Sequence, residues 1–86
     1  MTRPRLATGA RLQYDDVREE HVLLIPEGVV RLNPTAAEVL DLCDGERSLE
    51  EIVDALSARY EGADIRDDIV ELVDAMAQKG LVVDAA

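Results

Sequence analysis

The sequence predicts an α+β domain in which a three-stranded antiparallel sheet precedes three helices. Short apolar runs separated by turn residues fill residues 11–32, and apolar residues at helical spacing follow from residue 34 onward. A chain of 86 residues has the length of one domain. We expect residues 11–86 to form this single domain and residues 1–10 to be a flexible lead-in.

Three short strands are expected before residue 33. Residues 11–14 alternate polar and apolar side chains, and residues 21–25 form a run of leucine and β-branched residues. A Pro-Glu-Gly turn at residues 26–28 connects this run to a third strand over residues 29–32. Connections this short indicate an antiparallel meander.

Three helices follow, and the third is followed by a short strand or a packed tail at residues 81–83. Each helix shows one apolar stripe at a spacing of 3.6 residues. A sheet followed by a pair of helices joined by a short turn is similar to a small winged-helix domain. The expected helices span residues 34–44, 49–61 and 65–79.

The ends of these helices carry recognisable capping residues. Asn33 is the predicted N-cap of the first helix, because the proline that follows it suits a first helical turn. Ser48 and Glu51 fit a capping box at the start of the second helix. Asp64 is the predicted cap of the third helix, and Gly80 is expected to end it.

The balance of charges argues against several functions. Nineteen acidic and nine basic residues give a net charge of −10, and a surface this negative repels nucleic-acid phosphates and anionic lipids. The N-terminal segment lacks the apolar core of a secretory signal, and no apolar run reaches the length of a membrane span. We therefore expect a cytoplasmic protein without nucleic-acid or membrane partners.

The sequence offers almost no residues for catalysis. His21 and Cys43 are the single histidine and the single cysteine, so no disulfide or cysteine cluster can form within the chain. We interpret His21 as structural and Cys43 as a small buried side chain of the first helix. The prediction is a protein with no catalytic residue, no metal and no cofactor.

A surface that recognises another chain is the remaining interpretation. The strand at residues 29–32 passes directly into a helix, so we expect it at a sheet edge that accepts an added peptide strand. The third helix has more apolar positions than a narrow core seam needs. The same free edge allows either a monomer or a dimer formed through the edge strand. The predicted peptide-binding residues are Val29, Val30, Arg31, Leu32, Ile69, Val70, Val73 and Ala77.

The run LLIPEGVVRLNPTAAEVLDLCDGERSLEEIV at residues 23–53 resembles the PqqD family of pyrroloquinoline quinone biosynthesis. The shared features are the Pro-Glu-Gly turn, the Leu-Asn-x-Thr-Ala element and the Cys-Asp-Gly element. The chain departs from the family at residues 70–72, where family members often place a phenylalanine. This resemblance implies a non-catalytic, winged-helix-like domain that binds a precursor peptide (PqqA) beside the third strand and third helix. It also implies that the domain presents this peptide to a radical S-adenosylmethionine enzyme (PqqE).

Two other interpretations of the sequence stay open. Acyl carrier proteins are similar in size and charge and carry their prosthetic group on a serine that precedes leucine, as Ser48 does here. That fold is all-helical, whereas residues 11–32 are predicted to be strands. A winged-helix domain that binds nucleic acid is the second alternative, and the net charge argues against it.

Overall fold

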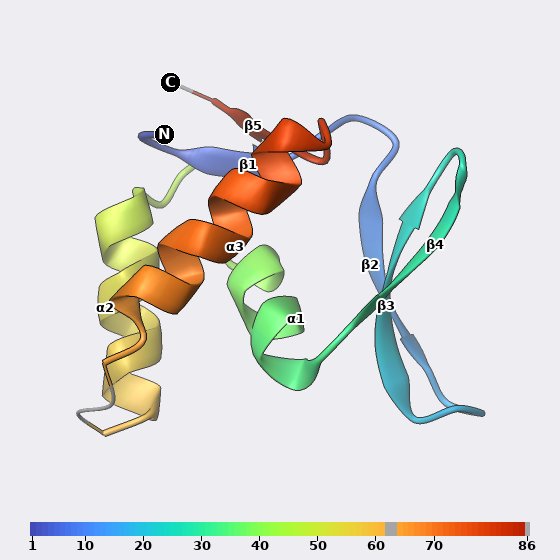
Figure 1. Cartoon of the computed structure of the whole chain (residues 1–86), viewed down its shortest axis with the longest axis horizontal. Coiled ribbons are helices and arrows are strands. Elements are labelled where there is room, and N and C mark those ends of the chain that lie inside the picture. Colours follow the sequence, from blue (N-terminus) through green and yellow to red (C-terminus); the bar gives the residue numbers. More distant parts are fainter. Residues whose placement is uncertain (62–63, 86) are drawn as a thin grey trace.

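The computed structural model describes residues 1–61 and 64–85. Figure 1 shows a three-stranded sheet beside three helices, and the two ends of the chain meet in a small sheet of two strands. The predicted α+β class, with a three-stranded antiparallel sheet followed by three helices, is confirmed. The elements are β1 (Pro4–Leu6), β2 (Arg11–Asp15), β3 (Glu20–Ile25), β4 (Gly28–Leu32), α1 (Pro34–Asp41), α2 (Leu49–Arg59), α3 (Arg66–Gln78) and β5 (Val82–Asp84).

The larger sheet has the order β2-β3-β4, so β2 and β4 are its two edges. Leu12, Leu23 and Val30 lie opposite one another across the three strands and belong to, or pack on, the hydrophobic core. Residues one position away along each strand point to the opposite face, because side chains alternate. That outer face carries Leu24 and Val29, which share a shallow hollow.

The predicted caps of the first two helices are confirmed. Asn33 Oδ1 accepts a hydrogen bond from the Ala36 backbone N–H at 2.7 Å, which satisfies one of the free donors of the first turn of α1. Ser48 Oγ accepts from the Glu51 N–H at 3.1 Å, and the Glu51 carboxylate accepts from the Ser48 N–H at 2.9 Å. These caps fix where the chain leaves the sheet and where it enters α2.

Two predicted helix boundaries need correction. The first helix ends at Asp41 rather than at residue 44, because Asp44 pairs with Arg5 of β1 in an isolated bridge. Asp64 does not cap α3, whose N-cap is Ile65 and has no side-chain cap. Asp67 and Asp68 provide negative charge in the first turn of α3 instead, where the helix dipole favours it. The predicted end of α3 at Gly80 is confirmed, since Gly80 adopts a φ of 75° directly after the helix.

The first ten residues are part of the fold rather than the flexible lead-in that the sequence suggested. Pro4–Leu6 forms β1, which pairs antiparallel with β5 at the other end of the chain. The Pro4 carbonyl accepts a hydrogen bond from the Gly45 N–H at 3.0 Å, and the Thr2 carbonyl accepts one from the Leu49 N–H at 3.0 Å. A three-residue strand that begins with proline has no detectable period, so the sequence pattern does not show it.

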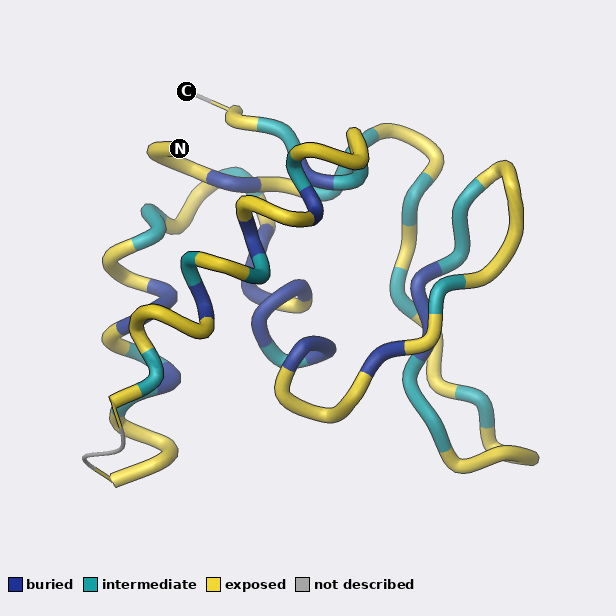
Figure 2. The backbone as a smooth tube through the Cα atoms, viewed as in Figure 1, coloured by how far each residue is buried: buried dark blue, intermediate teal, exposed yellow. Residues whose placement is uncertain are grey.

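The hydrophobic core lies between the helices and the inner face of the larger sheet. Figure 2 shows the buried segments of α1, α2 and α3 turned toward one another. Within the described residues, no helix is both long and apolar enough to span a membrane. The side chains with no exposed surface include Leu23, Leu40, Ile52, Leu56 and Val73.

Candidate functional site

The open edge of β4 is fixed by the hairpin that precedes it. Ile25 and Gly28 pair with each other across the two-residue turn at residues 26–27. In such a hairpin the flanking pair exchanges both backbone hydrogen bonds, and bonded and non-bonded pairs alternate beyond it. The pairing therefore determines which backbone groups of β4 face β3 and which face the open edge.

By this alternation the backbone groups of Val30 turn toward Leu23 of β3, whereas those of Val29 and Arg31 turn outward. The side chains point to the two faces of the sheet, with Val30 on one face and Val29 and Arg31 on the other. Val30 packs on the core, while Val29 is 60% exposed and lies with Arg31 on the outer face of the sheet. An added strand would thus bond to Val29 and Arg31 through the backbone and contact Val30 at the side of the helices.

Of the predicted residues of α3, Ile69 and Val73 face the core. Their side chains are 1% and 0% exposed, and Leu32 of β4 is also buried. These side chains hold α3 and β4 in place, and a peptide on the surface does not reach them. Their role in any site is to set the position of the surface residues beside them.

Val70 and Ala77 are half-buried on the side of α3 that faces α2. Arg66, one helical turn before Val70, donates two hydrogen bonds to the carboxylate of Glu50 in α2. Ala77 lies three turns after Arg66, on the same side of the helix. Val70 lines a hollow whose described lining residues all belong to α3.

Leu72 of α3 and Lys79, which follows the helix, are two candidate site residues that the sequence prediction missed. Leu72 packs on the core, and Lys79 follows seven residues later on the same face of the helix. Lys79 lines a hollow of about 300 Å³ together with Val30 of β4. The sequence indicated that the third helix has more apolar positions than a narrow core seam needs, but helical spacing alone does not show which side of the helix faces the sheet.

That hollow is built by three segments that lie far apart in the sequence, residues 7–10, 25–30 and 79–81. The other lining residues are Ala7, Thr8, Ala10, Ile25, Pro26, Glu27, Gly80 and Leu81. The Ala7 N–H donates to the Leu81 carbonyl at 2.9 Å, which joins the segment after β1 to the segment before β5. The walls are mainly apolar, and Lys79 and Glu27 supply opposite charges.

Two cations lie near β4, Arg31 on the outer face of the sheet and Lys79 in the hollow beside Val30. Arg31 forms an ion pair with Glu20 at 3.4 Å, and its side chain is 70% exposed, so solvent screens the pair strongly. Lys79, the single lysine of the chain, forms no ion pair with any described residue. Lys79 is therefore the cation that is available to a negatively charged ligand in this region.

The Cys-Asp-Gly element has a structural role. Cys43 is buried, and burial together with the Asp44 carboxylate raises the pKa of its thiol to about 12. Asp44 accepts hydrogen bonds from the backbone N–H groups of Arg47 and Glu46, and these bonds hold the pKa of its carboxyl below the usual value. Gly45 has a φ of 80°, and an added Cβ would lie 3.1 Å from Ala85 Cβ. The element thus shapes the connection between α1 and α2. The absence of a side chain at Gly45 leaves room for Arg5 and Ala85, which belong to the two ends of the chain.

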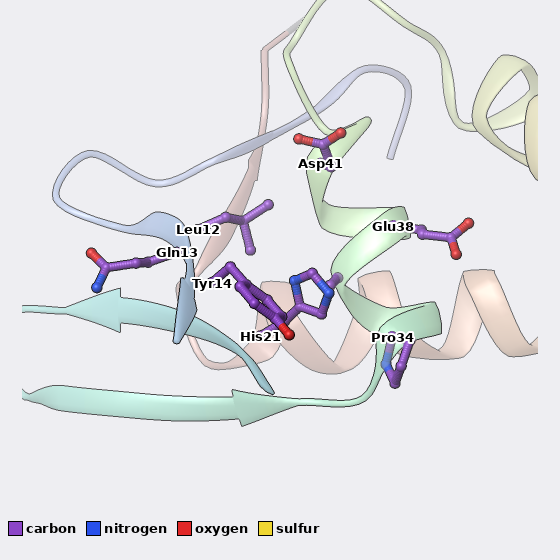
Figure 3. Close-up of a pocket in the computed structure, with 8 residues that line it drawn as sticks. Leu12, Gln13, Tyr14, His21, Pro34, Glu38 and Asp41 are labelled. Carbon is purple, nitrogen blue, oxygen red and sulfur yellow. The ribbon is translucent and has the colours of Figure 1, made fainter. Parts of the chain in front are cut away.

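A second hollow, of about 340 Å³, lies between β2 and α1. Figure 3 shows the ring of Tyr14 against the imidazole of His21 beside α1, with Glu38 and Asp41 on the helix directed away from these rings. The two ring centroids are 4.9 Å apart at an angle of 61°, an edge-to-face arrangement. No group of three or more His, Cys, Asp or Glu residues in the described chain is arranged to hold a metal ion. His21 thus packs as an aromatic partner of Tyr14.

Comparison with known proteins identifies the family. The family model of PqqD, described as coenzyme PQQ synthesis protein D, matches residues 20–82. The chain belongs to the PqqD family. A relative from Rhodopseudomonas palustris (strain TIE-1), named PqqA binding protein, is 41% identical over 86 residues, which cover 98% of this chain and 84% of the relative.

Solved PqqD structures share the fold. The solution structure of the PqqD truncation of Methylobacterium extorquens PqqCD is 39% identical, with a TM-score of 0.77 over 93% of this chain and 87% of that one. That truncation is described as a functional, stand-alone recognition element for ribosomally synthesised and post-translationally modified peptides. The crystal structure of PqqD from Xanthomonas campestris is 40% identical, with a TM-score of 0.59 over 88% of this chain and 87% of that one.

Proposed function

We propose that this chain binds a PqqA-type precursor peptide as an added strand on the open edge of β4. The observation that carries the proposal is the position of this edge beside an apolar hollow that reaches Lys79. The edge offers the backbone groups of Val29 and Arg31, and the hollow offers space for side chains. The relatives named PqqA binding protein support the same ligand.

The binding residues of this proposal differ in part from those expected from the sequence. Val29, Val30 and Arg31 stay in the site, through their backbone or through an accessible side chain. Leu72 and Lys79 replace Val70 and Ala77 as the contribution of α3. Leu32, Ile69 and Val73 support the site from the core.

The wider role follows from the same proposal. The domain is a winged-helix-like, cytoplasmic carrier that has no catalytic chemistry of its own and presents the bound peptide to a PqqE-type radical S-adenosylmethionine enzyme. An acyl-carrier function has little support, because Ser48 Oγ serves as a helix cap and β3 and β4 occupy residues 20–25 and 28–32. A nucleic-acid function has little support from a net charge of −10.

The single lysine allows a direct test of the site. Acetylation with a water-soluble N-hydroxysuccinimide ester modifies Lys79 and the α-amine of the first residue, and mass spectrometry separates the two products. We expect saturating PqqA-type peptide to slow acetylation of Lys79 about tenfold if the peptide covers the hollow. The α-amine belongs to Met1, which precedes β1, whereas the hollow is lined by residues that follow β1. It therefore serves as an internal control.

A second measurement locates the peptide on the sheet. In a backbone amide titration, the largest shifts are expected at Val29, Val30 and Arg31 and along the Leu72–Lys79 side of α3. A peptide with the same composition in scrambled order controls for nonspecific association. Unchanged Lys79 acetylation together with shifts confined to α2 would rule out the proposed site.

A further inference from the structure

The outer face of the larger sheet arranges its side chains in rows that end at β4. Residues that pair across antiparallel strands place their side chains next to each other on the same face. Two rows on the outer face reach β4, and they are Arg11–Leu24–Val29 and Gln13–Val22–Arg31. A strand added beside β4 would extend each row by one side chain, and these two side chains would be two positions apart in the added strand.

The first of these rows is apolar where it reaches β4. Leu24 is half-buried, and Val29 is 60% exposed. Edge strands of natural sheets usually carry charged residues that discourage pairing, so an exposed valine leaves this position favourable for an added strand. Apolar side chains on directly opposite residues stabilise the pairing of two strands. The side chain that extends this row is therefore expected to be apolar, because it would cover the exposed surface of Val29.

The second row ends in a cation. Val22 is 5% exposed in the central strand, whereas Arg31 at the edge carries a side chain that is 70% exposed. Glu20 approaches Arg31 Nε at 3.4 Å, and no other described residue forms an ion pair with Arg31. A guanidinium carries N–H donors on each of its nitrogens, so one solvent-screened pair leaves donors for a second carboxylate. The side chain that extends this row is therefore expected to be acidic.

We propose that the bound segment of the precursor peptide carries an acidic residue opposite Arg31 and an apolar residue opposite Val29, two positions apart. This inference rests on the proposed function, because it assumes a peptide strand added at β4. The residue between the two points to the inner face, where Val30 and the hollow that contains Lys79 receive it. The order of the two residues reports the direction of the peptide. The acidic residue comes first in an antiparallel strand, and the apolar residue comes first in a parallel one.

The charge of the whole molecule makes the position of the acidic residue selective. A net charge of −10 repels carboxylates from the surface in general, so an acidic peptide residue binds favourably where a cation meets it. A slip of one residue turns every side chain of a strand to the other face of the sheet. In the slipped register the acidic residue would lie opposite Val30, whose side chain packs on the core. Arg31 thus fixes the register of the peptide as well as its composition.

The test exchanges charges across the interface. Each acidic residue of a PqqA-type peptide is replaced in turn by lysine, and every peptide is titrated calorimetrically against the unmodified chain and against Arg31→Glu. Arg11→Glu makes the same charge change on the same face, at the opposite edge of the sheet about 10 Å away. Lys79→Glu makes it in the hollow on the inner face. Val29→Thr keeps the β-branched shape and the outward backbone groups but reduces the apolar surface.

We expect Arg31→Glu to weaken binding of the original peptide about tenfold, because like charges then lie directly opposite each other. One lysine-substituted peptide should recover at least about fivefold of this loss with Arg31→Glu and show no recovery with Arg11→Glu. Arg11→Glu should leave the affinity of the original peptide within about twofold. Val29→Thr should weaken binding about threefold, and this loss should vanish when the peptide residue two positions from the rescuing site is alanine.

Three outcomes would overturn this inference and leave the added strand at β4 in place. The first is an equal loss of affinity in Arg11→Glu and Arg31→Glu, which would indicate a general effect of charge. The second is the absence of any rescuing peptide while the backbone amides of Val29 and Arg31 still shift on binding. The third is rescue confined to Lys79→Glu, which would move the acidic contact to the inner face. Peptide binding without amide shifts in β4 would instead contradict the proposed function, and this inference with it.

Discussion

At the residue scale, the thiol of Cys43 is held in a form that cannot react readily. Its Sγ donates to the Val39 carbonyl at 3.3 Å, and its pKa is raised to about 12, first by burial and second by the neighbouring Asp44 carboxylate. The nucleophilic form of cysteine is the thiolate, so little of it is present near neutral pH. This confirms the expected burial of Cys43.

The prediction is that native protein resists alkylation at pH 8. Iodoacetamide should modify Cys43 at least about a hundredfold more slowly in the folded chain than in 8 M urea, because both exposure and thiolate are lacking. Mass spectrometry of quenched samples measures the two rates. Rapid alkylation of the native chain, together with loss of peptide binding in a fully stable Cys43→Ser variant, would instead indicate a reactive thiol.

Three carboxylates connect stability to pH. Hydrogen bonds from the Ser48 backbone and side chain lower the pKa of Glu51, and the Arg66 guanidinium lowers the pKa of Glu50. Backbone N–H groups of Arg47 and Glu46 lower the pKa of Asp44. A pKa that is lower in the folded chain than in the unfolded chain means that the ionised carboxylate stabilises the fold.

The stabilisation from these groups is complete above their unfolded pKa values, near pH 4 to 5, and is lost as the pH falls through the folded values. We expect the urea midpoint to be nearly constant from about pH 6 to 8 and to fall below about pH 4. Glu51→Gln keeps an acceptor for the Ser48 N–H but cannot titrate, so its midpoint should fall less over the acid range. An equally steep loss in that variant would show that Glu51 does not contribute.

At the scale of the elements, two of the three predicted helix N-caps are present, whereas the packing direction of α3 was not predictable. Asn33 and Ser48 were recognised because a cap depends on residues within three positions, and both caps are present. The contribution of α3 to the site depends on which flank of its stripe faces β4. The orientation of α3 depends on packing with residues distant in the sequence, such as buried Ile52 and Leu56 of α2, and no local pattern encodes it.

The edge of β4 gives the sharpest test of added-strand binding. Arg31→Pro removes the outward N–H of Arg31, and proline is tolerated on an edge strand. Arg31→Ala removes the same charged side chain and keeps that N–H. We expect Arg31→Pro to weaken peptide binding at least about tenfold relative to Arg31→Ala, measured by isothermal titration calorimetry.

Circular dichroism and urea midpoints establish that both Arg31 variants are folded. Val30→Pro is a poor substitute, because the Val30 N–H faces β3 and its loss breaks the sheet itself. Equal affinities of folded Arg31→Pro and Arg31→Ala would mean that the peptide does not bond to this N–H. If both variants bind weakly, the side chain of Arg31 rather than its backbone contributes the affinity.

At the scale of the whole molecule, the two ends of the chain pair with each other, because β1 and β5 form a two-stranded sheet. Asp84 in β5 accepts hydrogen bonds from the backbone N–H groups of Thr2 and Arg3, each at 3.0 Å. Val82, which is 2% exposed, pairs with Leu6 of β1, and the segment after β1 lines the same hollow as Lys79. The sequence pattern did not reveal this closure, since each strand has three residues and their partners lie more than seventy positions apart.

Removal of residues 1–6 is therefore expected to affect both stability and binding. Without β1, Val82 becomes exposed, the Gly45 and Leu49 N–H groups lose their acceptors, and Ala7 is no longer held next to Leu81 by a paired strand. A shortened chain should unfold at lower urea concentration. In the fraction that stays folded, it should bind PqqA-type peptide more weakly, because the wall of the hollow is displaced.

A matched control lacks only Met1 and keeps each of these contacts. Native amide exchange separates the two effects, since loss of protection at Leu81–Val83 reports the closure and loss at Leu56 reports the core. If the shortened chain kept both its midpoint and its peptide affinity, the ends would have no part in holding the site.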